Sequence, residues 1–282
     1  MNILANLSDN YKRWADGKLE GFTDKIDDLL VEINNPLNIS TAEKRQINKI
    51  IKSKNVVFFS VNKPISDTKK QIKTYASIFG MGDYELDSKS DADGLTEIKN
   101  NKKTQQDIEY IPYSDKQLNW HTDGYYNSQS NSILSWLLYC VCPSDDGGIN
   151  KYMDHEIAYI LYNKNYQNIT KLMIPDSYII PENKSNGRPE VKNPVFSFVN
   201  NRLNMKFSMR EKYIIWNDKI TKEMNNLKNI IENSHDYHLT YKLQAGQGVV
   251  TNNVIHMRTA FTNSKNKNRL LYRLRSKIRV RC

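Results

Sequence analysis

The second half of the chain consists largely of short runs of apolar, β-branched and aromatic residues separated by turn residues. Such runs are typical of strands that lie half or fully buried in a sheet. Two segments, 154–163 and 221–234, have helical character instead. A few helices inserted among many strands favour an α+β fold, mainly β, with a double-stranded β-helix (jelly roll) core decorated with helices. The pattern does not fit a series of βαβ units.

The expected elements can be placed along the whole chain. Two helices are predicted in the first third, at 41–53 and 67–80, around a buried strand at 55–61. No repeat or long linker divides the chain, so we expect a single domain over 1–282, with 1–40 as an N-terminal helical extension. The later elements are a loop at 82–107 with a short strand near LTEIKN, a long strand at 131–141, a hairpin across NNR that joins 193–199 to 202–209, and a strand-like tail at 246–281.

Composition excludes several classes of protein. Apolar residues make up 39% of the chain and charged residues 26%, which is ordinary for a globular domain. The longest apolar run, ILSWLLYCVC at 133–142, is too short to span a bilayer, and the N-terminus has no apolar segment of the signal-peptide kind. Three cysteines are too few for a disulfide framework, so we expect a reducing, cytoplasmic location and no membrane partner.

The net charge of +10 raises the question of a nucleic-acid partner. The lysines are scattered from Lys12 to Lys277, and asparagine and isoleucine are abundant as well. This pattern indicates a general coding bias rather than a basic binding surface, so nucleic acid is not favoured. A small-molecule partner fits better, and the sequence is compatible with a homo-oligomer.

The stretch NWHTDGYYN, residues 119–127, carries the first chemical signal. If it lies on a strand, residues two apart point to the same face, so His121 and Asp123 would project side by side. One imidazole and one carboxylate that converge on a point are two of the three ligands of a facial metal site. Gly124 would let the backbone pass close to such a metal.

Four histidines could supply the third ligand: His155, His235, His238 and His256. His155 stands at the start of a predicted helix and is expected to be a surface or capping residue. His235 and His238 have a spacing that can bind metal, but they fall in a polar segment where exposed histidines are common. His256 falls near the end of an apolar strand, where a hydrogen-bonded core histidine is the ordinary alternative; arginines follow it closely in the sequence.

Four segments together give the chain a family resemblance. They are WHTDGYY, PSDDGGINKYMDHEIAYI, NNVIHMRTAF and RLLYRLR, in that order. With them the chain, from about residue 40 to its end, resembles the taurine dioxygenase/TfdA-like family of Fe(II)- and 2-oxoglutarate-dependent oxygenases, which also includes γ-butyrobetaine hydroxylase-like members. A lone His-x-Asp is a weak signal, but the ordered set is specific.

The resemblance implies a set of metal and cosubstrate residues. His121, Asp123 and His256 would bind Fe(II) and leave positions open for 2-oxoglutarate and O2. Arg269 would hold the distal carboxylate of 2-oxoglutarate, because a planar guanidinium can grip a carboxylate with two hydrogen bonds. Asn150 stands where the family often has a threonine that helps to bind 2-oxoglutarate, and its amide could donate in place of the hydroxyl.

The resemblance assigns other residues less closely. Arg273 matches an arginine that contacts either the substrate or the cosubstrate, and Arg258 is expected to support the site rather than bind a ligand. Gln117, Tyr125 and Tyr126 are candidates for contact with the substrate. For each tyrosine, as for Trp120, core packing is the competing interpretation.

The expected activity is an Fe(II)/2-oxoglutarate-dependent oxygenase that hydroxylates or desaturates a small metabolite, with release of succinate and CO2. Arg273 would need a buried anionic partner, and no acidic residue is near it in the sequence. A small anionic substrate, possibly amino-acid-like, is therefore expected, with Asp154 or Glu156 as alternative protein partners. A zinc-dependent hydrolase and a non-catalytic binding protein on the same scaffold are the two rival functions.

Overall fold

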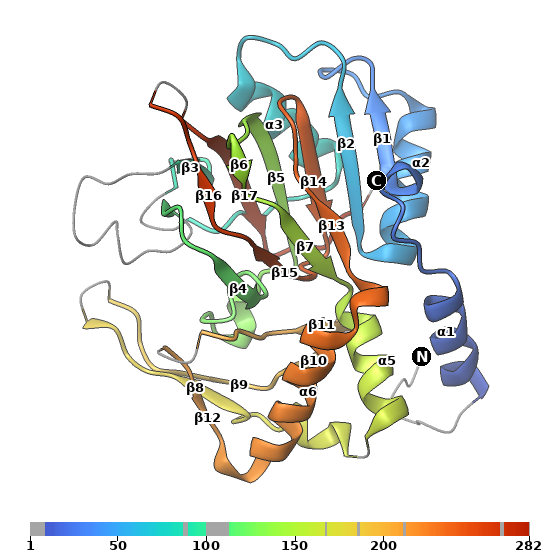
Figure 1. Ribbon diagram of the computed structural model, residues 1–282, viewed down its shortest axis with the longest axis vertical. Coiled ribbons are helices and arrows are strands. Elements are labelled where there is room, and N and C mark those ends of the chain that lie inside the picture. The colour runs from blue at the N-terminus through green and yellow to red at the C-terminus, as the bar shows by residue number, and fades with distance from the viewer. Residues whose placement is uncertain are drawn as a thin grey trace.

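A computed structural model describes residues 9–86, 90–99, 113–166, 168–184, 187–210, 213–265 and 268–281. Two sheets dominate its upper half (Figure 1). The larger has six strands in the order β1-β2-β14-β5-β17-β3. Their bounds are β1 Leu30–Ile33, β2 Val56–Val61, β14 Gln247–Thr251, β5 Ser135–Cys142, β17 Leu270–Ser276 and β3 Leu95–Lys99. All neighbouring pairs are antiparallel except β1 and β2.

The smaller sheet has four antiparallel strands in the order β13-β7-β15-β4. Their bounds are β13 Leu239–Tyr241, β7 Asn150–Met153, β15 Ile255–Arg258 and β4 Leu118–His121. One continuous apolar core joins the two sheets, since Tyr152 and Leu239 of the smaller sheet are buried among Phe58, Leu137 and Val249 of the larger one. The space between the sheets is therefore the centre of the fold.

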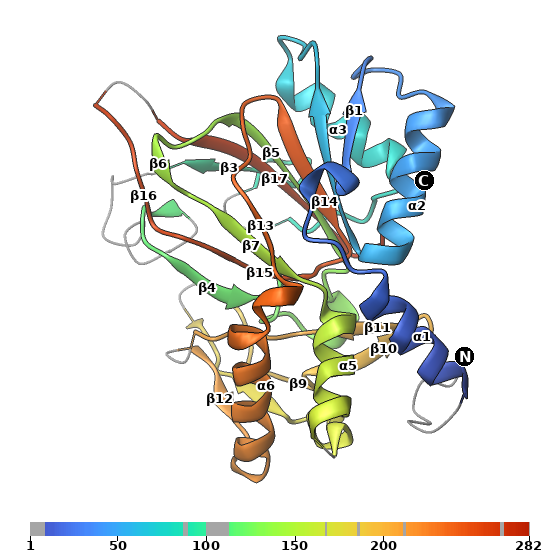
Figure 2. The same ribbon diagram turned by 45° about the vertical axis from the view of Figure 1, so that its right-hand side comes forward.

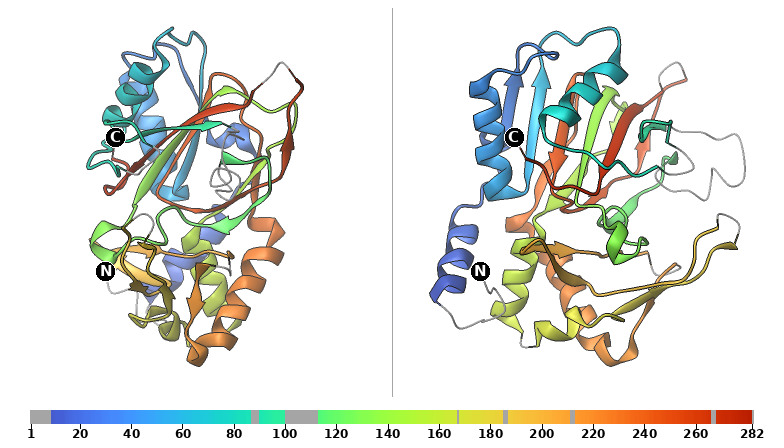
Figure 3. Two further views of the ribbon diagram at one scale, coloured as in Figure 1. Left: turned by 90° about the vertical axis from the view of Figure 1, so that its left-hand side faces the viewer. Right: turned by 180° about the vertical axis from the view of Figure 1, so that it is seen from behind.

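Helices α2 (Thr41–Lys54) and α3 (Thr68–Ile78) cover the outer face of the larger sheet, as the two views of Figure 3 show. A capping box starts α2: the Ser40 hydroxyl accepts from the Glu43 N–H, and the Glu43 carboxylate accepts from the Ser40 N–H. The Asp67 side chain caps α3. Both helices bury apolar side chains against the larger sheet, so they belong to its core.

A second apolar core lies below the sheets, around helices α1, α5 and α6 (Figure 2). The bounds are α1 Asp9–Glu20, α5 His155–Asn165 and α6 Thr221–Asn233. Short strands complete this half: β8 Tyr178–Ile180, β9 Val191–Asn193 and β12 Ile215–Trp216 form one sheet, and β10 Phe196–Val199 and β11 Arg202–Met205 form a hairpin. In the upper half, β6 Asp146–Gly147 pairs with β16 Phe261–Thr262 (Figure 1). In the described part of the chain, the short 3-10 helices are η1 Ile26–Leu29, η3 Gln129–Asn131, η4 Ile169–Met173, η7 Asp218–Ile220 and η8 His235–Tyr237.

The α+β class is confirmed, and most predicted elements are present within a few residues. The hairpin turns at Asn200 and Asn201, both with positive φ as a two-residue turn of this kind requires. Among the described residues, no helix is both long and apolar enough to cross a membrane. Residues 87–89 and 100–107 of the predicted loop at 82–107 fall outside the described residues, and β3 lies where the short strand was expected.

Two expectations about the chain's ends need correction. The segment 1–40 is not a purely helical extension, because β1 lies within it and pairs with β2 at the edge of the larger sheet. The strand-like tail expected at 246–281 does not run unbroken to His256. A break at 252–254, with Asn253 at φ 55°, separates β14 from β15. The break sends the chain from the larger sheet to the smaller one, a change of sheet that strand periodicity alone does not reveal.

Candidate functional site

Three side chains converge at one edge of the smaller sheet. His121 is the last residue of β4, and His256 lies directly opposite it on β15. Asp123 follows two residues after His121 but lies beyond the strand, in the turn that begins there. The prediction that His121 and Asp123 share one face of a strand is therefore wrong. A turn, and not strand alternation, brings Asp123 back towards the histidines.

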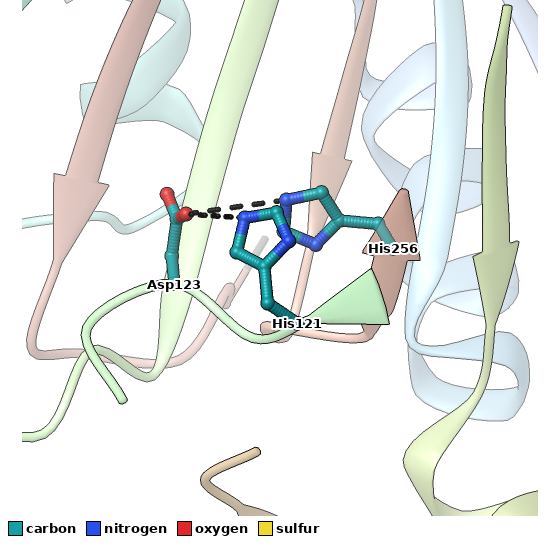
Figure 4. Close-up of side chains that lie close together, drawn as sticks. All are labelled: His121, Asp123 and His256. Atoms are coloured by element: carbon teal, nitrogen blue, oxygen red, sulfur yellow. Dashed lines mark ion pairs between the residues drawn. The ribbon is translucent and has the colours of Figure 1, made fainter. Parts of the chain in front are cut away.

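The geometry of the three side chains suits a metal ion (Figure 4). The Asp123 Oδ1 atom lies 3.7 Å from His121 Nε2 and 3.9 Å from His256 Nε2. One possible ligand atom from each residue lies within 4.8 Å of the others, and no other group of histidine, cysteine or acidic side chains in the described part of the chain meets that condition. The two imidazole rings are 4.2 Å apart between centroids.

Backbone hydrogen bonds fix which nitrogen each histidine presents. His121 Nδ1 lies 2.8 Å from the Asn119 carbonyl oxygen, and His256 Nδ1 lies 3.1 Å from that of Val254. A carbonyl oxygen can only accept, so each Nδ1 carries the proton and each Nε2 directs its lone pair towards Asp123. This arrangement orients metal-binding histidines in many proteins.

The charges around the site hold all three groups in the form that binds a metal. Burial, together with the charge of His256, lowers the pKa of His121 to about 3. Burial also lowers the pKa of His256. Burial alone would raise the pKa of Asp123, but the neighbouring Arg273 and Arg275 hold it below its usual range. Two neutral imidazoles and one carboxylate are thus ready at neutral pH, without loss of protons on metal binding.

Arg269 lies in the interior and has no ion pair with any carboxylate that the structure describes. Only 5% of its surface is exposed. Its guanidinium lies over the Phe261 ring, 4.9 Å from the centroid, and Arg258 lies 4.8 Å from the same ring. Burial lowers the pKa of Arg269 to about 10. A buried cation without a described acidic partner is costly, so an anionic ligand at this position would stabilise it.

Two further buried polar atoms also have no hydrogen-bond partner among the described residues. They are the hydroxyl of Tyr152 and the indole nitrogen of Trp136, both fully buried. The Trp136 ring is 4.7 Å from that of His256, and the charge of Arg269 acts on the Tyr152 hydroxyl. Buried polar groups are usually satisfied, so both atoms could donate a hydrogen bond to a polar ligand.

Asn150 and Arg258 are cross-strand neighbours on β7 and β15. Asn150 is buried, which is compatible with a contact to a ligand in the interior. Arg258 donates from Nη2 to the backbone carbonyls of Ser114 and Lys116, the segment that leads into β4. Arg258 thus fixes the approach of the strand that carries His121, in line with the supporting role expected of it.

Arg273 pairs with a protein carboxylate that sequence reasoning did not identify. Its Nη1 atom lies 3.3 Å from Oδ2 of Asp123, the acidic residue of the metal-ligand group. Neither Asp154 nor Glu156 fills this role: both form ion pairs with Lys18 instead. Asp123 and Arg273 are far apart in the sequence, so only their contact in the folded chain reveals that they are partners.

The aromatic candidates near Asp123 differ in their surroundings. Trp120 is buried and packs against His238, with ring centroids 4.9 Å apart, and Tyr125 is buried in the second core. Tyr126 is partly exposed, and its hydroxyl accepts from Arg275 Nη1 at 2.7 Å. Of the three, Tyr126 is therefore the best placed to meet a ligand from solvent.

Gln117 is not brought together with the site. It is exposed, and its amide donates to Asn119 Oδ1 at 3.0 Å. Two of the three other candidate histidines bond to backbone carbonyls. His155 is buried rather than exposed, with Nε2 near the Leu203 carbonyl, and His238 bonds to the Ile231 carbonyl. Both are structural in this fold.

Sequence reasoning missed Arg275 and Glu85 as neighbours of the site. Arg275 Nη2 lies 2.6 Å from Glu85 Oε2, and Glu85 also accepts from the Asn127 amide at 2.6 Å. Through Glu85, these contacts join the segment after Asp123 to β17 of the larger sheet. Arg275 lies two residues after Arg273, so the two side chains share one face of a strand, and this spacing is the one signal that could have identified it.

Comparisons with known proteins agree with this geometry. The family model "Taurine catabolism dioxygenase TauD, TfdA family" matches residues 19–275. A search of curated proteins finds no match.

Solved structures with a similar fold include several oxygenases. An asparagine oxygenase in complex with Fe(II), 2S,3S-3-hydroxyasparagine and succinate has a TM-score of 0.58 and 10% identity, over 96% of this chain and 92% of that one. The non-heme iron oxygenase OrfP in complex with (3S)-hydroxy-L-Arg has a TM-score of 0.61 and 12% identity, over 96% and 92% of the two chains. A taurine dioxygenase from Burkholderia xenovorans has a TM-score of 0.56 and 15% identity, over 87% of each chain.

At these identities the solved structures establish the fold, while the family model covers most of the chain. The resemblance that the sequence motifs predict is confirmed, and so is the expectation of a dioxygenase. The chain belongs to the Taurine catabolism dioxygenase TauD, TfdA family.

Proposed function

We propose that the protein is an Fe(II)- and 2-oxoglutarate-dependent oxygenase that oxidises a small metabolite and releases succinate and CO2. The observation that carries the proposal is the convergence of His121, Asp123 and His256 within 4.8 Å. Two imidazoles and one carboxylate on one side of a metal suit Fe(II) and leave positions for a cosubstrate and oxygen. The double-stranded β-helix is the core architecture that we propose for the two sheets, of which the smaller carries His121 and His256.

The residues around the site have separate tasks in this proposal. Fe(II), when bound with 2-oxoglutarate and O2, supplies an oxidant strong enough to attack an unactivated C–H bond. His121, Asp123 and His256 hold the metal, and Arg273 keeps the Asp123 carboxylate charged and oriented. Arg269 binds the distal carboxylate of 2-oxoglutarate, with Asn150 as a further donor. Burial of these groups excludes water from the reacting centre.

The substrate that we propose is a small anionic or amino-acid-like metabolite. Arg273 does not require such a substrate, because it pairs with Asp123. A cation beside Tyr126 supports the proposal instead: the Arg188 guanidinium lies 5.8 Å from the centroid of the Tyr126 ring. The asparagine oxygenase and OrfP structures, which hold hydroxylated amino acids, are compatible with this class.

The test starts from protein that is reconstituted with Fe(II) under anaerobic conditions. Oxygen and 2-oxoglutarate are then added, and the formation of succinate is measured. We expect wild-type protein to form succinate and the His256→Ala variant to lose Fe(II) binding and turnover together. His235→Ala is the matched control, because His235 is exposed and is not one of the three converging residues. Wild-type protein that retains zinc and forms no succinate would favour the zinc hydrolase instead. Metal binding without turnover over a metabolite panel would favour the binding protein.

A further inference from the structure

We propose that Asn253 is a positioning residue that sets where the metal ligand Asp123 stands relative to His256. The inference rests on the proposed metal site and concerns a residue that does not touch the metal ligands' donor atoms. Asn253 is 2% exposed and lies in the break between β14 and β15. Asn253 also lies only three residues before His256 in the chain.

The Asn253 amide bonds to both backbone groups of Asp123. Its Oδ1 accepts from the Asp123 N–H at 2.9 Å, and its Nδ2 donates to the Asp123 carbonyl at 3.0 Å. The second hydrogen of Nδ2 goes to the Ile133 carbonyl at 2.8 Å. One side chain therefore holds the main chain of Asp123 from both sides, which leaves the carboxylate as the part of the residue that faces the histidines.

These bonds replace the strand pairing that Asp123 lacks. His121 and His256 are held opposite each other by the β4–β15 pairing, but β4 ends at His121. Without Asn253, the Asp123 backbone would be attached to the site only through the chain on either side of it. Hydrogen bonds of this kind stabilise a fold modestly, and a donor or acceptor left unpaired in the interior costs more than the bond contributes.

The backbone of Asn253 explains why an amide residue occupies this position. Its φ of 55° lies in the left-handed region, which asparagine adopts more readily than most residues. The same conformation makes the turn from the larger sheet to the smaller one. The turn and the clamp on Asp123 are thus supplied by a single residue, and the position of one metal ligand is tied to the strand that carries another.

The neighbouring Asn252 provides a control of the same chemical type. It is 7% exposed, and its amide also makes two buried hydrogen bonds. They go elsewhere: Nδ2 donates to Asn55 Oδ1 at 3.1 Å, and Oδ1 accepts from the Val280 N–H at 3.0 Å. Asn252 therefore fastens the end of α2 to the C-terminal segment rather than to the metal ligands, so its loss should cost stability alone.

The experiment compares Mn(II) affinity and the thermal unfolding of metal-free protein in four chains: wild type, Asn253→Gly, Asn253→Asp and Asn252→Ala. Glycine keeps the left-handed backbone and removes the clamp, so Asn253→Gly should bind Mn(II) about 10- to 100-fold more weakly. Aspartate keeps the acceptor for the Asp123 N–H and loses the donors, so its affinity should be intermediate. Asn252→Ala should unfold at a lower temperature with unchanged Mn(II) affinity.

The outcomes separate this inference from the proposed function. No Mn(II) binding by wild-type protein would contradict the metal site itself. Binding by wild type, with equal affinity in whichever Asn253 variant remains folded, would overturn the positioning role and leave the metal site intact. An equal loss of affinity in Asn252→Ala would overturn it as well, because general destabilisation would then explain the effect.

Discussion

The guanidinium of Arg273 lies against the carboxylate of Asp123, with 3.3 Å between Nη1 and Oδ2. The Asp123 side chain is 5% exposed and that of Arg273 is 13% exposed, so water screens the pair little. Asp123 is thus shared between a cation of the protein and the proposed metal. Each should compensate for loss of the other.

The first prediction tests that sharing. Arg273→Leu should lower the free energy of unfolding of the metal-free protein by about 3–5 kcal/mol, because it leaves Asp123 as a buried charge without its partner. Saturating Mn(II) should reduce the difference between variant and wild type, since the metal neutralises the same carboxylate. Denaturant unfolding with and without Mn(II) measures both values. A difference that Mn(II) leaves unchanged would contradict the shared role.

The second prediction concerns Arg269, which has no described acidic partner. Arg269→Leu should weaken 2-oxoglutarate binding to metal-loaded protein by about tenfold or more, because a charged hydrogen bond to a carboxylate is worth roughly 1.5–3 kcal/mol. The same change should stabilise the metal-free protein, because it removes a buried charge that nothing described in the chain neutralises. Calorimetric titration and thermal unfolding measure the two effects. Arg202→Leu, at an exposed position on β11, is the control and should change neither. Unchanged 2-oxoglutarate affinity would remove Arg269 from the cosubstrate site.

The third prediction concerns the glycine that follows Asp123. Gly124 has φ 67°, and a Cβ there would lie 2.5 Å from Cγ1 of Ile133. Gly124→Ala should therefore destabilise the protein and weaken Mn(II) binding, since the turn that presents Asp123 must shift. Gly17→Ala is the opposite case: Gly17 lies inside α1, and a Cβ added there would have nothing within 4 Å, so the change should add about 0.5–1 kcal/mol of stability. Equal unfolding temperatures for the two variants would contradict the argument.

The fourth prediction uses Lys206, a lysine that holds the segment after Asp123. Its Nζ donates to the carbonyls of Asn127 and Ser128 at 2.6 and 2.8 Å and lies 3.3 Å from Asn193 Oδ1. Burial lowers the pKa of Lys206 to about 7, against an ordinary value of 10.5. Between these two values the unfolded chain holds more protons than the folded one, so a rise in pH favours folding.

Lys206→Met should remove this pH dependence. From pH 7 to pH 9, the free energy of unfolding of wild type should rise relative to that of the variant by about 2 kcal/mol. Urea unfolding of both proteins at the two pH values gives the difference. A constant difference would mean that the three oxygen acceptors keep the ammonium protonated in the folded state throughout this range.

The sequence by itself determined what depends on residues close together in the chain. The capping box of Ser40 and Glu43, the turn at Asn200 and Asn201, and the alternation of the strands all act over a few positions, so a local pattern predicts them. The family resemblance added the metal-ligand candidates, because its motifs are short stretches of sequence around His121 and His256. The structure brings these candidates together.

Only the tertiary structure decided which groups meet across long distances in the chain. Asp123 and Arg273 are 150 positions apart, and Asp123 and Asn253 are 130 apart. Their contacts arise from the packing of two sheets and from the turn that takes Asp123 off its strand, neither of which leaves a periodic signal. Burial is decided in the same way, since it is a property of the assembled sheets: Arg269 is enclosed without a described acidic partner, while Gln117, four residues before His121, stays in solvent.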